Sequence, residues 1–244
     1  MRWYTSSPRV ELLGAMTATI ATDNRIAADL AICLTFRNCC HMLWPKGANM
    51  PNVKPLARED LPQFEEVFSN VDANMGFLPT SLLTMGRVPE VLGGFLALGG
   101  AVLQNPVIDG ELKNLVSHAA SAANGCRYCQ AHTGATAASQ GTDTAKVAAV
   151  WEFETSDLFT DAERAALRLA FHSGSSPNAA TAGDFEECRK HYSEEQIVAI
   201  VAVCALFGYL NRWNDTMATQ LESEPKEFGN ENLTAVGWQV GRHA

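Results

Sequence analysis

The residues best suited to chemistry are two cysteines and a histidine in the run Cys126-Arg127-Tyr128-Cys129-Gln130-Ala131-His132. A C-x-x-C pair can act as a dithiol that is oxidised to a disulfide, and a neighbouring imidazole can accept the proton that turns a thiol into a nucleophilic thiolate. The three residues are spaced so that they follow one side of a helix. The run therefore predicts a redox-active dithiol at Cys126 and Cys129, with His132 as its acid–base partner.

The surrounding residues predict that this dithiol opens a helix. Apolar residues at helical spacing run from Asp109 to Ala123, Asn124-Gly125 is a stop signal, and the helix Cys126–Ser139 follows directly. The first backbone N–H groups of a helix have no partner within it, so they favour a negatively charged sulfur. Such surroundings lower a thiol pKa from about 8.5 to about 3.5–7.5.

Helical patterns also dominate the rest of the chain after Met50. Two capping boxes, Thr160 with Glu163 and Ser193 with Gln196, begin the last long helices. No segment alternates as a strand does, so the fold class is all-α. A likeness between 112–116 and 197–201 leaves an internal duplication open. Further helices are predicted at Thr80–Met85, Glu90–Leu103, Asp143–Trp151, Asp161–His172, Ala180–His191 and Ser193–Leu221.

Composition excludes several functional classes. The 244 residues are 47% apolar, carry a formal net charge of -9 and have a pI near 5.1. This acidity and the lack of a basic stripe argue against nucleic acid as a partner. By inspection no apolar run reaches the roughly 18 residues of a membrane span. Seven cysteines at irregular spacing are not the disulfide framework of a secreted protein, so we expect a cytoplasmic protein.

Three regions are expected along the chain. Residues 1–47 lack a sustained period and are predicted to be a poorly organised extension, with the working protein starting near Met50. Residues 48–222 form the helical domain. Residues 223–244 show no strong period and are expected to be a C-terminal tail.

The dithiol has two competing interpretations. One is a buried cysteine pair with an unrelated histidine. The other is zinc, because Cys188 and His191 form a C-x-x-H pair that would complete a tetrahedral set with Cys126 and Cys129. Both pairs lie in helical sequence instead of zinc knuckles, and a histidine also suits the last turn of a helix. We therefore predict neither a metal nor a cofactor and keep zinc as an alternative.

The run from Asn124 to His132, preceded by the helix Leu112–Ala123, resembles the signature of the alkylhydroperoxidase D-like, carboxymuconolactone decarboxylase family. The flanks are similar as well, in the lead-in Gly76-Phe77-Leu78-Pro79 and the later segments at 159–167 and 209–212. The resemblance spans about Pro51 to Leu221 and implies a bundle of packed helical hairpins that forms homo-oligomers, often trimers or hexamers.

In the peroxidase branch of that family the second cysteine attacks the peroxide and the first resolves the sulfenic acid to a disulfide. The resemblance thus implies that Cys129 is the peroxidatic thiol and Cys126 the resolving thiol. Condensation of a sulfenic acid with a neighbouring thiol is ordinary sulfur chemistry, and an external thiol reductant restores the dithiol by exchange.

Two positions depart from the family pattern. The family histidine lies four residues after the second cysteine, where this chain has Thr133; His132 is turned from it by about 100° on a helix. The family relay glutamate falls at Asn114. Three residues are candidates for the missing relay: Glu111, Glu163 and His118. The alternative is that the two glutamates cap helices and that His118 is a satisfied core histidine.

The leading hypothesis is a thiol-dependent peroxidase that reduces hydroperoxides through Cys129 and Cys126. A second hypothesis is a decarboxylase of a cyclic lactone acid, although decarboxylase members generally lack the cysteine pair. A third is a non-catalytic helical oligomer that senses redox state or binds zinc. Residues Tyr209, Asn211, Arg212 and Trp213 end the last long helix, where they are either core residues or the lining of a pocket mouth.

Overall fold

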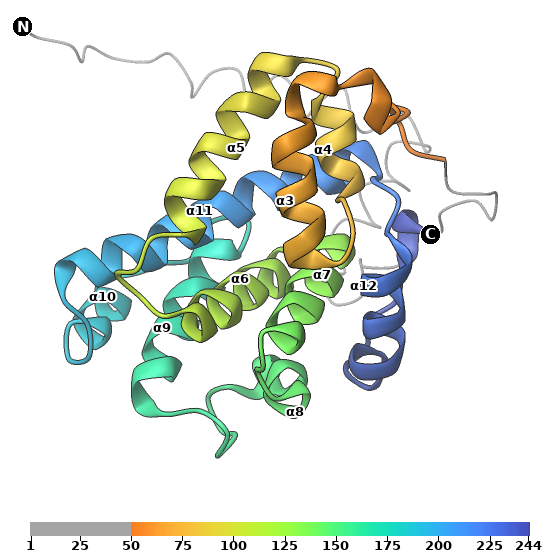
Figure 1. The fold of residues 1–244 in the computed structure, drawn as a ribbon. Coiled ribbons are helices and arrows are strands. Elements are labelled where there is room, and N and C mark those ends of the chain that lie inside the picture. Colours follow the sequence, from red (N-terminus) through yellow and green to blue (C-terminus); the bar gives the residue numbers. More distant parts are fainter. Residues whose placement is uncertain (1–49) are drawn as a thin grey trace, which may run out of the picture. The chain divides into compact units, whose positions relative to one another are not determined.

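The computed structural model describes residues 50–244, which fold into ten α-helices and several shorter helical turns without a strand in that range (Figure 1). This confirms the all-α prediction. The expected extension at 1–47 lies outside the described residues. The helices are α3 (Glu65–Met75), α4 (Thr80–Met85), α5 (Pro89–Leu103), α6 (Gly110–Asn124), α7 (Arg127–Ser139), α8 (Thr144–Ala148), α9 (Asp161–Gly174), α10 (Ala182–Cys188), α11 (Glu194–Met217) and α12 (Ser223–Phe228).

The main core lies where α6, α9 and α11 pack together. Apolar side chains of all three helices are fully or almost fully buried there, and each buried Leu, Ile or Val removes enough surface from water to contribute about 1.5–3 kcal/mol. A smaller core joins α3, α4 and α5 to the end of α11. The buried residues of this core on the three central helices include Leu115, Val116, Ala119, Ala166, Leu167, Ala170, Ile197, Ile200 and Val203.

A single glycine connects the buried helix α6 to the helix that carries the dithiol. Gly125 ends α6 at a φ of 85°, in the left-handed region that a side chain disfavours. The next residue, Cys126, is already the N-cap of α7. The predicted stop at Asn124-Gly125 is confirmed, and the short connection fixes the start of α7 against the core.

Two long helices begin as the sequence predicts. Thr160 and Glu163 form a complete capping box at the start of α9, and Ser193 and Gln196 form another at the start of α11. These caps satisfy backbone N–H groups that have no partner within the helix.

The C-terminal segment differs most from the sequence-based expectation. The helix predicted to run to Leu221 ends at Met217, because Ala218 takes the left-handed conformation with a φ of 49°. The segment expected to be a tail contains α12 and short helical turns up to His243. It packs on α7 (Figure 1). There the buried Trp238 donates its indole N–H to the carbonyl of Arg127 at 3.0 Å.

One described helix, α11, is long and apolar enough to cross a membrane by length and composition alone, with a mean hydropathy of 1.4 over its most apolar window. The sequence pattern predicts no apolar segment long enough to span a membrane. In this fold α11 packs against α5, α6, α7 and α9, which is the position of a core helix.

The contact between α6 and α9 depends on Gly174. A Cβ atom at this position would lie 2.5 Å from the carbonyl oxygen of Ala120, which is backbone and cannot rotate away. We expect Gly174→Ala to lower the free energy of unfolding by about 1–3 kcal/mol. In contrast, a Cβ at Gly208 in α11 meets nothing within 4 Å, so Gly208→Ala should raise the stability by about 0.5–1 kcal/mol. Urea unfolding of both variants measures this; equal stabilities would contradict the close approach.

Candidate active site

The two thiols of the C-x-x-C motif lie together at the start of α7. Cys126 caps the helix, and its sulfur accepts the backbone N–H of Cys129 at 3.4 Å. Both cysteines are free thiols, and they are 0% and 2% exposed. A dithiol at a helix start was the geometry expected from sequence, whereas its complete burial was not.

The surroundings of the two sulfurs differ. Burial raises the pKa of the Cys126 thiol well above its ordinary value, and the hydrogen bond with Cys129 and the charge of Asp215 raise it further. The sulfur of Cys129 instead accepts the side-chain N–H of Asn214 at 3.4 Å. A hydrogen bond to the charged form favours that form. The sulfur of Cys129 therefore has a hydrogen-bond donor from α11.

His132 is held by a carboxylate that the sequence analysis missed. Its Nε2 lies 2.6 Å from Oε2 of Glu222, and the other oxygen of Glu222 accepts the hydroxyl of Tyr128 at 2.8 Å and the backbone N–H of Thr80. The Tyr128 ring stacks on the imidazole, and Phe77 meets it edge-on. Glu222 lies just beyond α11 in a segment without periodicity, so no sequence signal indicated it.

The pKa values in this network follow from burial and charge. Burial alone would raise the pKa of Glu222, but the charge and hydrogen bond of His132 outweigh it and the pKa is lowered. Burial raises the pKa of Tyr128 well above its ordinary value, and the charge of Glu222 adds to the effect. Near neutral pH, Tyr128 is thus a phenol and Glu222 a carboxylate, an arrangement able to hold and deliver protons beside the dithiol.

The side chain of His118 is linked to the backbone of the C-x-x-C motif through Thr133. Its Nδ1 lies 2.8 Å from the hydroxyl of Thr133, and that hydroxyl donates to the carbonyl of Cys129 at 2.7 Å. Burial lowers the pKa of His118 to about 4, so the ring is neutral near pH 7. An imidazole from α6 therefore meets the threonine that stands in place of the family histidine, and this chain of bonds ends on the backbone of Cys129, not on its sulfur.

The two candidate relay glutamates lie elsewhere. Glu111 and Glu163 both bind the ammonium of Lys146, at 2.9 and 2.6 Å. Burial alone would raise the pKa of Glu163, but the bond from Lys146 outweighs it and the pKa is lowered. Glu163 also completes the cap of α9. The third position, Asn114, donates its side-chain N–H to Gln140. None of these contacts connects a glutamate to the thiols.

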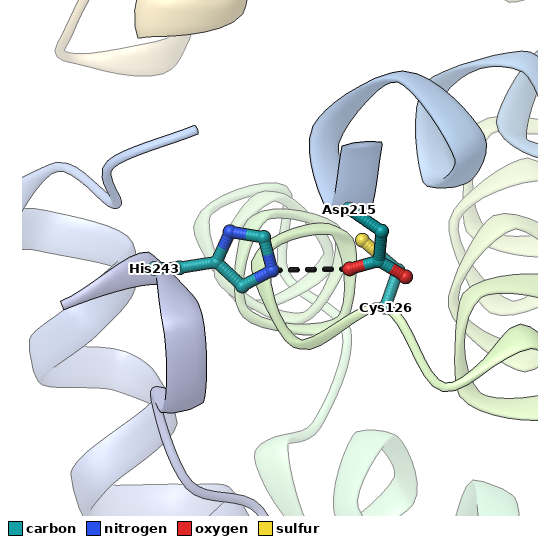
Figure 2. Close-up of side chains that lie close together, drawn as sticks. All are labelled: Cys126, Asp215 and His243. Carbon is teal, nitrogen blue, oxygen red and sulfur yellow. Dashed lines mark hydrogen bonds and ion pairs between the residues drawn. The ribbon is translucent and has the colours of Figure 1, made fainter. Parts of the chain in front are cut away.

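A third buried imidazole, that of His243, lies beside the dithiol (Figure 2). His243 places Nε2 3.1 Å from Oδ1 of Asp215, and the possible ligand atoms of both side chains lie within 4.8 Å of the sulfur of Cys126. Nδ1 of the same ring lies 2.8 Å from the carbonyl of Thr219. Neither Asp215 nor His243 was a sequence candidate, since the first sits in the last turn of α11 and the second in the segment interpreted as a tail.

The zinc set considered from sequence is not assembled. Cys188 is buried in α10, where its thiol donates to the carbonyl of Ala165 at 3.3 Å and burial raises its pKa to about 11. Among residues 50–244, the group with metal-ligand spacing consists of Cys126, Asp215 and His243, and it includes neither Cys188 nor His191.

The end of α11 adds polar groups to this region. Asn211 is fully buried, and within the described part of the chain neither its amide N–H nor its amide oxygen has a hydrogen-bond partner. The indole N–H of Trp213 and the amide oxygen of Asn214 are likewise without a partner there. Buried polar atoms in this state are costly, so these groups are candidates to bind water or a ligand.

Comparison with known proteins places this geometry in a family. The sequence profile of the carboxymuconolactone decarboxylase family matches residues 89–171, which include the dithiol. The solved structure of the debrominase Bmp8 shares 40% identity with this chain, covers 73% of it and 96% of its own length, and superimposes with a TM-score of 0.70. The chain belongs to the carboxymuconolactone decarboxylase family. The resemblance seen in the sequence is thereby confirmed.

Other solved members of this AhpD-like fold are more distant. A peroxidase-related protein from Ralstonia eutropha JMP134, described as an alkylhydroperoxidase AhpD core, shares 23% identity over 72% of this chain and 94% of its own, with a TM-score of 0.65. A peroxidase-related protein from Silicibacter sp. TM1040 shares 20% identity over 71% and 90%, with a TM-score of 0.60. No curated protein sequence matches the chain. The carboxymuconolactone decarboxylase profile does not reach Asp215, Glu222 or His243.

The bond between His132 and Glu222 gives a test of the network. We expect Glu222→Gln to lower the free energy of unfolding at pH 7 by about 1.5–3 kcal/mol, the usual size of a hydrogen bond to a charged group. Because the pKa of Glu222 is lowered in the fold, its contribution is present above the ordinary value of 4.5 and is lost as the pH falls through the lowered value. The measurement is denaturant unfolding of both proteins between pH 7 and pH 3.

The matched control is Glu224→Gln, which neutralises an exposed carboxylate two residues away. It should change the stability by less than about 0.5 kcal/mol. A difference between wild type and Glu222→Gln that stays constant with pH, or that Glu224→Gln reproduces, would contradict a charged role for Glu222.

Proposed function

We propose that this protein is a dithiol-dependent reductase in which Cys129 and Cys126 together supply two electrons and end as a disulfide. The observation that carries the proposal is the pair itself: two free, buried thiols at one helix start, near enough for their side chains to hydrogen bond. An i, i+3 pair at a helix N-terminus is compatible with disulfide formation. No metal or flavin is needed for this chemistry.

The environment supports separate roles for the two sulfurs. Asn214 donates a side-chain hydrogen bond to the sulfur of Cys129, whereas the sulfur of Cys126 caps the helix and accepts the backbone N–H of Cys129. Cys126 has a raised pKa and stays a protonated thiol until it resolves the modified Cys129 to a disulfide. Cys129 is therefore the attacking sulfur and Cys126 the resolving sulfur, as the family resemblance also implies.

The substrate class follows from the chemistry of sulfur and from the similar solved structures. A thiolate can take an electrophilic atom, either oxygen from a peroxide or bromine from carbon, and a second thiol then displaces that atom as the disulfide forms. Reductive debromination balances as R–Br plus two thiols giving R–H, a disulfide and HBr. Peroxide reduction balances as ROOH plus two thiols giving ROH, water and a disulfide.

We propose a small halogenated aromatic compound as the principal substrate. The debrominase Bmp8, 40% identical over almost its whole length, was crystallised as a cysteine-to-alanine variant in complex with 2,3,4-tribromopyrrole. The described side chains beside the dithiol suit an apolar ring, because Tyr128, Leu210 and Leu221 pack on the cysteines. Tyr128, His132 and Glu222 form a proton-bearing network that is positioned to supply the hydrogen of the product.

A hydroperoxide is the second candidate substrate. It is favoured by the C-x-x-C motif, which reduces peroxides in the peroxidase branch that this chain resembles. The relay expected for a peroxidase is altered, since Asn114 binds Gln140 and the candidate glutamates bind Lys146. His132 with Glu222 takes the place of that relay in the proposal. In either case an external thiol reductant returns the disulfide to the dithiol.

We expect Cys129→Ser to lower the rate of substrate consumption by at least about 1,000-fold, the order seen when a nucleophile is removed. The reduced protein is given 2,3,4-tribromopyrrole or cumene hydroperoxide with a dithiol reductant, and bromide release or peroxide loss is followed. Cys126→Ser should react once and then stop, leaving a modified Cys129 that mass spectrometry detects. Cys204→Ala, a change in the core of α11, should turn over like wild type.

Each outcome decides between the candidates. Bromide release without peroxide loss supports the halogenated substrate, and the reverse supports the peroxide. If neither compound oxidises the free dithiol to a disulfide, the proposal of a reductase for these substrates fails. If Cys126→Ser abolishes the first reaction while Cys129→Ser retains it, the two roles are exchanged.

We also propose that the protein works as a homo-oligomer. Several large apolar side chains on the surface of α5 and α11 are exposed in the single chain, including Leu98 at 52% and Val198 at 67%. Val91 and Leu98 are seven residues apart and lie on the same side of α5. Exposed apolar residues that share a helix face mark interaction sites.

The oligomer proposal predicts a mass above that of one chain, 26.4 kDa, in sedimentation equilibrium. Leu98→Glu should shift the mass toward that of a single chain, because a charge cannot be buried in an apolar contact without a partner. Glu90→Gln, on the exposed first turn of the same helix, is the control and should leave the mass unchanged. A wild-type protein that sediments as one chain contradicts the proposal.

A further inference from the structure

Three possible metal ligands converge beside the dithiol from three separate segments of the chain (Figure 2). They are Sγ of Cys126 at the start of α7, a carboxylate oxygen of Asp215 in the last turn of α11, and Nε2 of His243 near the end of the chain. These atoms all lie within 4.8 Å of one another. The proposed reductase chemistry uses Cys126 alone of the three, so the convergence of the other two needs a separate explanation.

The hydrogen bonds of His243 show which form of the ring the fold prepares. Nδ1 lies 2.8 Å from the carbonyl of Thr219, and a carbonyl only accepts, so Nδ1 carries a hydrogen. In the neutral ring Nε2 then has a free lone pair. A histidine whose Nδ1–H is fixed by a backbone carbonyl, so that Nε2 is the nitrogen left to take a ligand, is the usual arrangement of a metal-binding histidine.

The other side of the ring faces a carboxylate. Nε2 lies 3.1 Å from Oδ1 of Asp215, so two atoms that both carry lone pairs meet at hydrogen-bond distance. A proton shared between the two atoms, or a metal ion bound by both, makes this contact favourable. The thiol of Cys126 lies on the same side and becomes a strong ligand when it gives up its proton.

We propose that Cys126, Asp215 and His243 bind a divalent transition-metal ion, with zinc as the best-fitting ion and a fourth position open to water. A thiolate, a carboxylate and a neutral imidazole carry two negative charges, which balance the ion. Sulfur, nitrogen and oxygen in a three-ligand set are the donors of zinc sites that keep one open position. Zinc bonds of about 2.0–2.3 Å in a tetrahedron separate the ligand atoms by about 3.3–3.8 Å, so small rotations of the side chains complete the site.

The site also has a route for the ion. The side chain of Asp215 is 34% exposed, whereas His243 is 1% exposed and Cys126 is fully buried. Asp215 thus joins the surface to the two buried ligands. The guanidinium of Arg242 donates to the backbone carbonyl of Asp215 at 3.0 Å.

A bound ion would regulate the dithiol. While Cys126 is a metal thiolate its sulfur cannot also bond to Cys129, so metal binding and disulfide formation exclude each other. Binding releases the thiol proton, and removal of the ion returns the reducing dithiol. This consequence rests on the proposed reductase, but the binding of the ion does not.

The first experiment measures zinc affinity directly on the full-length protein, reduced and stripped of metal, in competition with a chromophoric chelator. Wild type should bind zinc at this site. Cys126→Ser, Asp215→Asn and His243→Asn should each lose more affinity than the roughly 10- to 100-fold that loss of an outer-shell partner costs. Cys129→Ser should keep the affinity, because its sulfur is not a ligand of the proposed site.

Two controls exclude other ligands and unfolding. Cys39→Ser with Cys40→Ser removes the cysteine pair outside the described residues and should leave the site intact. Asp215→Asn changes a partly exposed side chain and is the variant least able to disturb the core, and circular dichroism checks its helices. Cobalt titration should give a thiolate-to-metal absorption band in wild type and Cys129→Ser but not in Cys126→Ser.

The second experiment is protection from alkylation. Zinc should slow iodoacetamide labelling of Cys126 in wild type, as read from peptide masses, and should not do so in Asp215→Asn. The proposal is overturned if wild type binds zinc no more tightly than Asp215→Asn. It is equally overturned if Cys129→Ser loses as much affinity as His243→Asn, which would assign the ion to the dithiol alone. None of these measurements uses turnover, so failure of the proposed reductase leaves them interpretable.

Discussion

The chemistry of this protein depends on one tight corner between two buried helices. Gly125 ends α6 in the left-handed conformation and Cys126 begins α7 at the next residue, so no loop separates the core from the dithiol. Because α6 is packed against α9 and α11, the corner brings the two sulfurs into the interior and fixes their orientation. Every later feature of the site, from the amide of Asn214 to the carboxylates, is arranged around sulfurs that cannot move away.

The cost of that burial explains the polar groups around the corner. A buried thiol resists ionisation, so at least one sulfur needs donors nearby if it is to react. Asn214 supplies one to Cys129 and the backbone N–H of Cys129 supplies one to Cys126, while the charge of Asp215 raises the pKa of Cys126. The same short stretch of chain therefore holds two thiols with different polar neighbours, and the proposed two-step exchange between sulfur atoms uses that difference.

Sequence reasoning was sufficient for the local features of this site and insufficient for its long-range partners. The helix start at Cys126, the stop at Gly125 and both capping boxes depend on neighbouring residues, so they could be predicted from spacing. The partners Glu222 and His243 depend on how the chain returns after α11, and nothing in residues 218–244 shows a period that reveals it. Glu111 and Glu163 were expected near the thiols because of their position on helices, yet Lys146 lies between those helices and binds both.

The sequence separations within the site have a consequence for folding. His132 and Tyr128 meet Glu222 across 90 and 94 residues, and Trp238 meets Arg127 across 111. Contacts between such distant residues form only after long loops have closed, so they come late compared with the helices themselves. During that interval the sulfurs of α7 lack the segment that shields them and are exposed to solvent oxidants and to the thiols of α10 and α11. During refolding, closure of the last segment thus competes kinetically with mispairing of the cysteines. A reducing environment suppresses the mispairing and favours the native fold.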